Sequence, residues 1–188
     1  MPAGCQEGIL KGLYLLRSSA EEKEPKVQLI GGGTILREAI AAADLLQQDW
    51  GVSADIWSAT SFSELRREGL DVDRWNLLHP EAAPRLSYVE QCFKDRKGPV
   101  VAATDYMKIV ADQIRPYVPR RFEVLGTDGF GRSDTREKLR AFFEVDRRWV
   151  TLTALRALAA DGEVPPAVVA EAMQKYGIDA EKPNPTTV

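Results

Sequence analysis

Short hydrophobic runs recur along the chain and are separated by stretches in which hydrophobic positions follow a helical period. A continuous hydrophobic run bounded by turn residues is typical of a strand that is buried on both faces of a sheet. Residues 100–104 form such a run, and β-prone runs that include polar residues stand at 9–16, 27–30, 54–58 and 122–125. We expect each of them to form a strand.

The first stretches between these runs predict helices whose ends are marked by capping residues and glycines. Thr34 is expected to cap a helix that Gly51 ends. Ser61 and Glu64 have the spacing of a capping box before a short helix, which Gly69 is expected to end. The hydrophobic face of the first helix consists of Ile35, Leu36, Ala39, Ile40, Ala43 and Leu46.

The middle of the chain has a broken helical pattern. Pro80 and Pro84 interrupt it, so no long element is expected between residues 71 and 96. Short helical segments are expected at residues 75–78 and 88–93. The polar stretch at residues 18–25, earlier in the chain, is expected to be an exposed connector.

The chain after residue 105 is mainly helical. A helix is expected over residues 106–114, and Asp134 with Glu137 has the spacing of a second capping box. Two further helices are expected, one from Asp146 to Gly162 and one from residue 165 to Gly177, before a proline-rich tail.

Strands that alternate with helices predict an α/β fold of three α/β/α layers. Right-handed crossover connections place helices on both faces of a mostly parallel sheet. With 188 residues, the chain has the usual length of one domain, so we expect residues 1–188 to form a single domain.

Composition and charge exclude several classes of protein. Hydrophobic residues make up 44% of the chain and charged residues 28%, as in folded soluble proteins. A net charge of −3 gives no overall attraction to nucleic acid or to an anionic membrane. No hydrophobic run has the roughly 20 residues of a membrane span, and the first residues lack a secretory signal pattern. We therefore expect a cytoplasmic protein in which Cys5 and Cys92 are reduced thiols.

Two glycine clusters could bind an anion next to the start of a helix. They are Gly31–Gly33, before Thr34, and the segment 126–131, which is followed by Arg132. The first cluster has Leu36 where a dinucleotide-binding motif requires glycine, and it lacks the Lys-Ser/Thr pair of a phosphate-binding loop. A tight turn is the favoured interpretation of the first cluster, and turn geometry explains the second equally well.

Residues suited to catalysis are scarce. His79 is the only histidine and precedes Pro80 at an expected helix end, where a solvated imidazole is the favoured interpretation. A site with several histidines is impossible, and no pair of carboxylates stands alone in a hydrophobic setting. The sequence therefore indicates no catalytic, cofactor-binding or metal-binding residue.

Polar and aromatic side chains gather where the expected strands end. In doubly wound sheets, ligands bind at the carboxyl ends of the strands. A contact with another domain is the favoured use of these residues, and ligand binding is the alternative. The interface candidates are Asp105, Tyr106, Asp128, Phe130 and Arg132, and Trp57 stands at another strand end.

Several ordered stretches resemble one enzyme family. They include DRWNLLHP at 73–80, ATDYMK at 103–108 and VLGTDGFGRSD at 124–134. Similar stretches stand at 26–29, 33–38, 57–65, 143–146, 176–179 and 182–185. Together they resemble the C-terminal domain of the homodimeric pyruvate dehydrogenase decarboxylase component, and they cover nearly the whole chain.

This resemblance implies a transketolase-like C-terminal domain of a thiamine-diphosphate enzyme with Mg²⁺. Such an enzyme decarboxylates pyruvate and passes the acetyl group to a lipoyl arm of dihydrolipoyl acetyltransferase. Its cofactor motif is Gly-Asp-Gly followed by Asn, which the segment 126–129 does not match, and the only asparagines are Asn76 and Asn184. The resemblance therefore places the cofactor in other domains of a longer parent protein and transfers no catalytic residue to this chain.

The favoured hypothesis is a non-catalytic module that supports a two-subunit enzyme and is inactive alone. Its partners would be the other domains of the parent and the second subunit. An alternative is an autonomous domain that binds a small anion or a nucleotide at residues 31–34 or 126–133. A self-sufficient hydrolase would need His79 as its base.

Overall fold

A five-stranded sheet forms the centre of the computed structural model, which describes residues 2–19 and 24–188. The strand order is β1-β3-β2-β4-β5, and only β1 is antiparallel to its neighbour. The strands are β1 (Leu13–Arg17), β2 (Lys26–Gly32), β3 (Ser53–Ala59), β4 (Val100–Ala103) and β5 (Phe122–Leu125). The expected mostly parallel sheet is confirmed.

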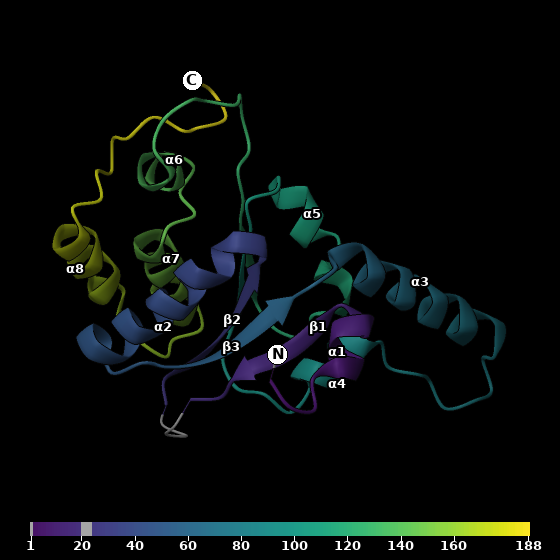
Figure 1. Cartoon of the computed structure of the whole chain (residues 1–188). Coiled ribbons are helices and arrows are strands. Elements are labelled where there is room, and N and C mark those ends of the chain that lie inside the picture. The colour runs from purple at the N-terminus through teal and green to yellow at the C-terminus, as the bar shows by residue number, and fades with distance from the viewer. Residues whose placement is uncertain (1, 20–23) are drawn as a thin grey trace.

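Helices cover both faces of this sheet, as the three-layer prediction requires (Figure 1). One face is covered by α2 (Leu36–Trp50), α7 (Arg147–Ala160) and α8 (Pro166–Tyr176). The other face is covered by α3 (Phe62–Leu78), α4 (Tyr88–Phe93) and α5 (Lys108–Asp112). The remaining helices are α1 (Gln6–Lys11), α6 (Arg136–Phe142) and the 3-10 turns Gly33–Ile35 and Arg115–Tyr117.

Two hydrophobic cores result because successive residues of a strand point to opposite faces. In β4, Val101 and Ala103 join the core under α2 and α7, whereas Val100 and Ala102 join the core under α3 and α4. All four side chains are buried. This double burial explains why the strand sequence is a continuous hydrophobic run.

Buried polar residues occupy the other end of the sheet, opposite the strand ends considered for function. Asp55 is fully buried, pairs with Lys26 at 3.1 Å and accepts a hydrogen bond from the Gln28 amide at 3.2 Å. Trp57 Nε1 donates to Gln28 Oε1 at 2.9 Å. These mutual bonds satisfy groups that would be costly to bury alone.

The chain start differs from the expected strand at residues 9–16. Residues 9–11 complete α1, and the strand begins only at Leu13. Gly12 ends the helix in the left-handed conformation, with φ of 99°, and Lys11 pairs with Glu7 one turn earlier. The expected connector at 18–25 lies partly outside the described residues.

The helix at residue 62 is much longer than expected. It runs through Gly69 to Leu78 and projects from the body as an arm (Figure 1). Gly69 does not end the helix, since its missing side chain makes room for Tyr117: a Cβ atom there would lie 2.4 Å from the ring. The expectation of no long element after residue 71 was therefore wrong.

Helix ends were predicted with mixed success. Gly51 and Gly177 close α2 and α8 in the left-handed conformation, as expected. Ser61 accepts a hydrogen bond from the Glu64 amide as expected, but the Glu64 carboxylate pairs with Arg67. The expected caps Thr34 and Asp134 were wrong. A 3-10 turn precedes α2 without a side-chain cap, and Thr135 caps α6. Within the described part of the chain, no helix is both long and hydrophobic enough to cross a membrane.

Candidate functional site

The strand order creates a crevice at the carboxyl ends of the parallel strands. After β2 the chain crosses to β3 on one side, and β4 later pairs on the other side of β2. Open α/β sheets bind ligands where the strand order reverses in this way. Thr34 follows β2, Asp105 follows β4 and Thr127 follows β5, and all three line a cavity of about 480 Å³. We call it the switch-point cavity.

Hydrogen bonds join the loops that surround this cavity. Thr34 Oγ1 donates to the Asp105 carboxylate at 3.2 Å, and Thr127 Oγ1 donates to the Asp105 backbone carbonyl at 2.8 Å. The Thr127 amide donates to the Tyr106 carbonyl at 2.9 Å. Asp128 accepts a hydrogen bond from the Lys108 amide at 3.0 Å and so fixes the start of α5. The three strand ends are therefore held as one unit.

One face of α6 and the residue after it form the opposite wall. Arg136, Leu139, Arg140 and Phe143 line the cavity. Their spacing of three and four residues places them on the same side of a helix. Val145 and Ile35 add hydrophobic surface to the lining. The wall therefore combines guanidinium groups with a hydrophobic floor.

A buried carboxylate holds α6 in this position. Glu38 of α2 is 4% exposed and pairs with Arg140 at 2.7 Å and with Arg147 Nε at 3.0 Å. Burial alone would raise the pKa of Glu38, but the hydrogen bonds and charges of Arg147 and Arg140 outweigh it and leave the pKa lowered. The ionised carboxylate thereby joins α2, α6 and α7.

The two other arginines of the cavity have no acidic partner in the described part of the chain. The Arg132 guanidinium lies 4.3 Å above the Phe142 ring centre and makes no ion pair there. Arg136 is exposed and likewise has no carboxylate partner among the described residues. The remaining acid of the lining, Asp134, lies 3.7 Å from Lys138.

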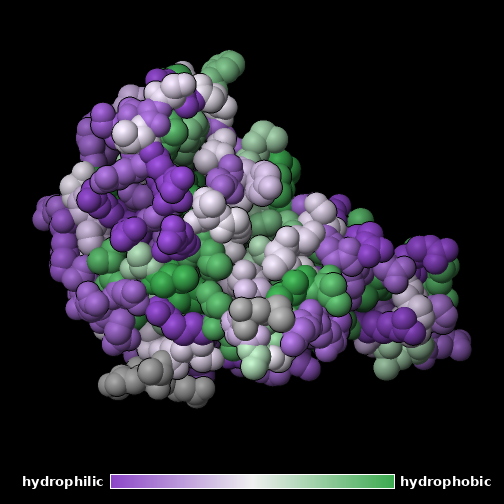
Figure 2. Space-filling view, in the orientation of Figure 1, coloured by the Kyte–Doolittle hydropathy of each residue, from purple (hydrophilic) through white to green (hydrophobic). Residues whose placement is uncertain are grey.

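Exposed hydrophobic side chains lie beside the cavity. Tyr106 is 61% exposed, Met107 57%, Ile109 63% and Phe130 81%. They come from the loop after β4, the start of α5 and the loop after β5, and we call them the strand-end surface. Figure 2 shows hydrophobic residues over α5, whereas the surface over α6 and α7 is largely hydrophilic.

Four of the five predicted interface residues divide between these two features. Asp105 and Arg132 line the cavity, and Tyr106 and Phe130 belong to the strand-end surface. Asp128 serves the local structure at α5. Trp57 takes no part in either feature, because it is buried with its ring centre 4.8 Å from that of Phe93.

The first glycine cluster is not an anion-binding turn. Gly31 and Gly32 belong to β2, and a Cβ atom on Gly31 would lie 2.4 Å from Leu36 Cα. Gly33 adopts a φ of 57°, and a Cβ atom there would lie 2.9 Å from Asp105 Oδ1. A carboxylate at this distance repels an anion, so the glycines serve close backbone packing.

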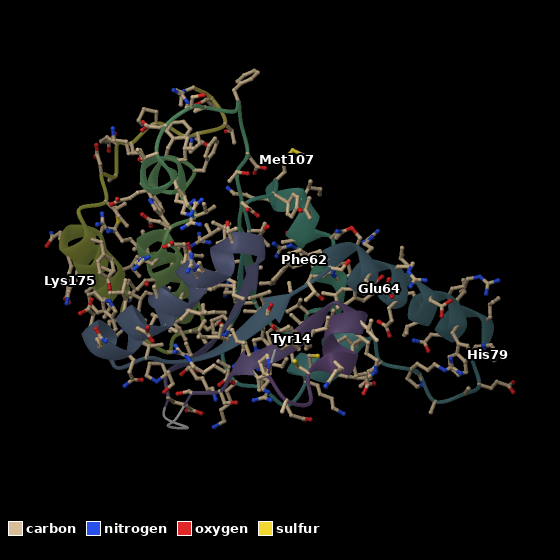
Figure 3. All side chains as sticks on the ribbon, viewed as in Figure 1. Tyr14, Phe62, Glu64, His79, Met107 and Lys175 are labelled. Carbon is tan, nitrogen blue, oxygen red and sulfur yellow. The ribbon has the colours of Figure 1, made fainter. Side chains whose placement is uncertain are left out.

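His79 lies far from the strand ends. It follows the last residue of α3, is exposed and stacks on Trp75 with ring centres 4.3 Å apart. Figure 3 shows it at the tip of the α3 arm, away from Met107. The Cys92 thiol has a pKa raised by burial, which disfavours the reactive thiolate. Neither side chain has the surroundings of a catalytic group.

Cavity residues on α6 were missed by the sequence reasoning. The spacing of Arg136, Leu139, Arg140 and Phe143 was a usable signal, because it predicts one helix face that carries both charge and hydrophobic surface. Thr34 was noticed only as a helix cap, and its bond to Asp105 joins residues 71 positions apart. Such a pairing has no local signature.

Comparison with known proteins identifies the fold and the family. A family model described as the transketolase-like TK C-terminal domain matches residues 12–146. A solved chain described as split gene transketolase, inactive beta4 tetramer, has a similar fold, with a TM-score of 0.54 and 17% identity over 79% of this chain and 43% of that chain. The protein belongs to the transketolase-like C-terminal domain family.

The curated relatives have a more specific description than the family model. The pyruvate dehydrogenase E1 component of Cupriavidus necator is 60% identical over 100% of this chain, and that of Pseudomonas aeruginosa is 61% identical over 98%. The chain spans 21% of the length of each relative. The resemblance found in the sequence is thus confirmed, and it concerns a C-terminal part of these longer proteins.

Proposed function

We propose that this chain is the non-catalytic C-terminal domain of a pyruvate dehydrogenase E1 component, with residues 1–188 forming one domain. The match of the whole chain to about a fifth of each relative supports a role that the remainder of the protein completes. In this proposal the longer protein is a cytoplasmic homodimer. It decarboxylates pyruvate and transfers the acetyl group to the lipoyl arm of dihydrolipoyl acetyltransferase, at the point where glycolysis delivers pyruvate.

Thiamine diphosphate and Mg²⁺ belong to the other domains in this proposal. Mg²⁺ needs a set of oxygen ligands beside the diphosphate. The described residues offer no group of three or more His, Cys, Asp or Glu side chains suited to a metal. The Asn76 amide is engaged by the Arg85 backbone, and Asn184 by Thr186. The donors of this chain therefore do not fit the cofactor, and the chain alone is expected to be inactive.

The strand-end surface is the observation that carries this proposal. Its exposed hydrophobic side chains stand on loops that are otherwise tied together by hydrogen bonds. An exposed hydrophobic surface of this kind is a feature of protein contacts. We assign it to the rest of the E1 chain and its second subunit. The net charge of −3 gives no support to a nucleic-acid partner.

Substitution of Phe130 in the longer protein tests this role. Phe130→Ala is expected to weaken dimerisation or cofactor retention at least about tenfold, since aromatic anchors dominate contact energies. Leu10→Ala is the matched control, because Leu10 is 80% exposed and lies on α1, which is not part of the strand-end surface. Sedimentation and thiamine diphosphate titration measure both effects. An unchanged dimer with unchanged cofactor affinity in Phe130→Ala would remove the proposal.

A further inference from the structure

The switch-point cavity has the size and position of a small-molecule site. Its volume of about 480 Å³ lies in the range of ligand pockets, which is about 300–1,000 Å³. It lies where the strand order reverses between β2 and β4, at the carboxyl ends of the strands. Both properties hold independently of the strand-end surface and of any docking role.

The charges of the cavity favour an anionic group. Arg140 is neutralised by Glu38, and Asp134 lies near Lys138. Arg132 and Arg136 remain without an acidic partner among the described residues and face the same cavity. A guanidinium group binds phosphate through two parallel hydrogen bonds, so these two can hold one phosphate monoester beside the single negative charge of Asp105.

The other lining groups add two further requirements. Asp105 Oδ2 already accepts a hydrogen bond from Thr34, while no described residue donates to Asp105 Oδ1. Asp105 is exposed, so this oxygen is free to accept a hydrogen bond from a ligand hydroxyl, and it would repel a second anionic group. Ile35, Leu139, Phe143 and Val145 form a hydrophobic part of the lining. The ligand therefore also needs a hydrophobic group.

We propose that the switch-point cavity binds a phosphate monoester that also carries hydroxyl groups and a hydrophobic ring, such as a nucleoside monophosphate. Arg132 and Arg136 hold the phosphate, Asp105 accepts a hydroxyl proton, and the ring lies on the hydrophobic lining. The site includes residues of the segment 126–133 considered above, but side chains of α6 and its preceding loop, and not the backbone of a glycine cradle, provide the positive charge.

Calorimetric titration of this chain with adenosine monophosphate tests the site. Saturable binding is expected, and adenosine, which lacks the phosphate, should bind at least about tenfold more weakly. Inorganic phosphate, which lacks the sugar hydroxyl groups and the ring, should also bind more weakly. No saturation with adenosine monophosphate at millimolar concentration, or equal binding of adenosine, overturns the proposal.

Paired variants locate the binding. Arg132→Gln with Arg136→Gln should lower the affinity for adenosine monophosphate by about tenfold or more. Arg74→Gln is the matched control, since Arg74 is exposed on the α3 arm and is expected to leave binding unchanged. Equal affinity of the double variant and the control contradicts the site. Unchanged circular dichroism shows that the double variant is folded, and Arg132→Lys with Arg136→Lys should restore part of the affinity.

This experiment is separate from the test of the docking role. Binding is measured in the 188-residue chain, whereas Phe130→Ala is measured in the longer protein. If one of the two proposals fails its test, the test of the other proposal is unaffected.

Discussion

At the residue scale, Gly69 shows how a missing side chain positions two elements. The Tyr117 ring crosses α3 at Gly69, and its hydroxyl donates to Asp73 at 2.9 Å, one turn further along the helix. Two main causes raise the pKa of Tyr117 to about 12: burial is the larger, and the nearby Asp73 carboxylate is the smaller. The hydroxyl therefore keeps its proton at neutral pH. Tyr117 thereby holds the segment after α5 against α3.

Gly69→Ala is expected to destabilise the protein. The new Cβ atom would lie 2.4 Å from the Tyr117 ring. Overpacking costs about 1–3 kcal/mol, which exceeds the gain of about 1 kcal/mol in helix propensity. Gly131→Ala is the control, because no atom lies within 4 Å of its added Cβ, and it should change the free energy of unfolding by less than about 0.5 kcal/mol. Urea unfolding compares the two, and a Gly69→Ala variant as stable as the parent would refute this packing role.

Single residues were predictable where their role is local. Gly51 and Gly177 end helices through their own backbone conformation, which the sequence pattern indicates directly. Thr34 was misassigned because its hydroxyl has a distant partner, Asp105. Gly69 was misassigned for the same reason, since Tyr117 determines what fits there.

At the element scale, Glu38 joins three helices. Its carboxylate on α2 accepts hydrogen bonds from Arg140 of α6 and from the backbone and side chain of Arg147 of α7. Burial opposes ionisation, but the arginines prevail and the pKa of Glu38 is lowered from 4.5. A lowered pKa in the folded state stabilises the fold above the unfolded pKa, and this stabilisation is lost as pH falls through the folded value.

Glu38→Gln tests this linkage through its pH dependence. At pH 7 the variant should lose about 1.5–3 kcal/mol of unfolding free energy, as expected for hydrogen bonds to a charged group. The difference from the parent should be complete above pH 4.5 and should shrink below it, because the parent carboxylate then becomes protonated. Glu137→Gln is the control on α6, since Glu137 is exposed. A constant difference between pH 7 and pH 3 would contradict the account.

Elements were predictable where hydrophobic pattern and length agree. The strands β2 to β5 were recognised because each contributes hydrophobic side chains to both cores, which gathers hydrophobic residues in its sequence. The arm of α3 was not recognised, because its outer half contacts few core residues and Leu77 is 77% exposed. Its helix is supported instead by contacts within the arm, such as Trp75 with His79 and Arg85.

At the scale of the whole molecule, the family and the layers followed from the sequence, while the cavity did not. The resemblance rested on ordered stretches such as residues 124–134, which the comparisons confirmed. The cavity depends on bringing Thr34, Asp105 and the α6 face together, and these segments lie far apart in the chain. The strand order determines which of these segments lie side by side, and short sequence patterns do not determine the strand order.

Hydroxyl-radical footprinting tests the central claim that the strand-end surface docks on the rest of the E1 protein. Tyr106, Met107 and Phe130 are exposed here and react readily with the radical, so each should be modified in the 188-residue chain. Phe93, which is fully buried, is the unreactive reference in both samples. The account predicts strong protection of the three exposed residues in the longer protein. Equal modification of these residues in the chain and in the longer protein would contradict it.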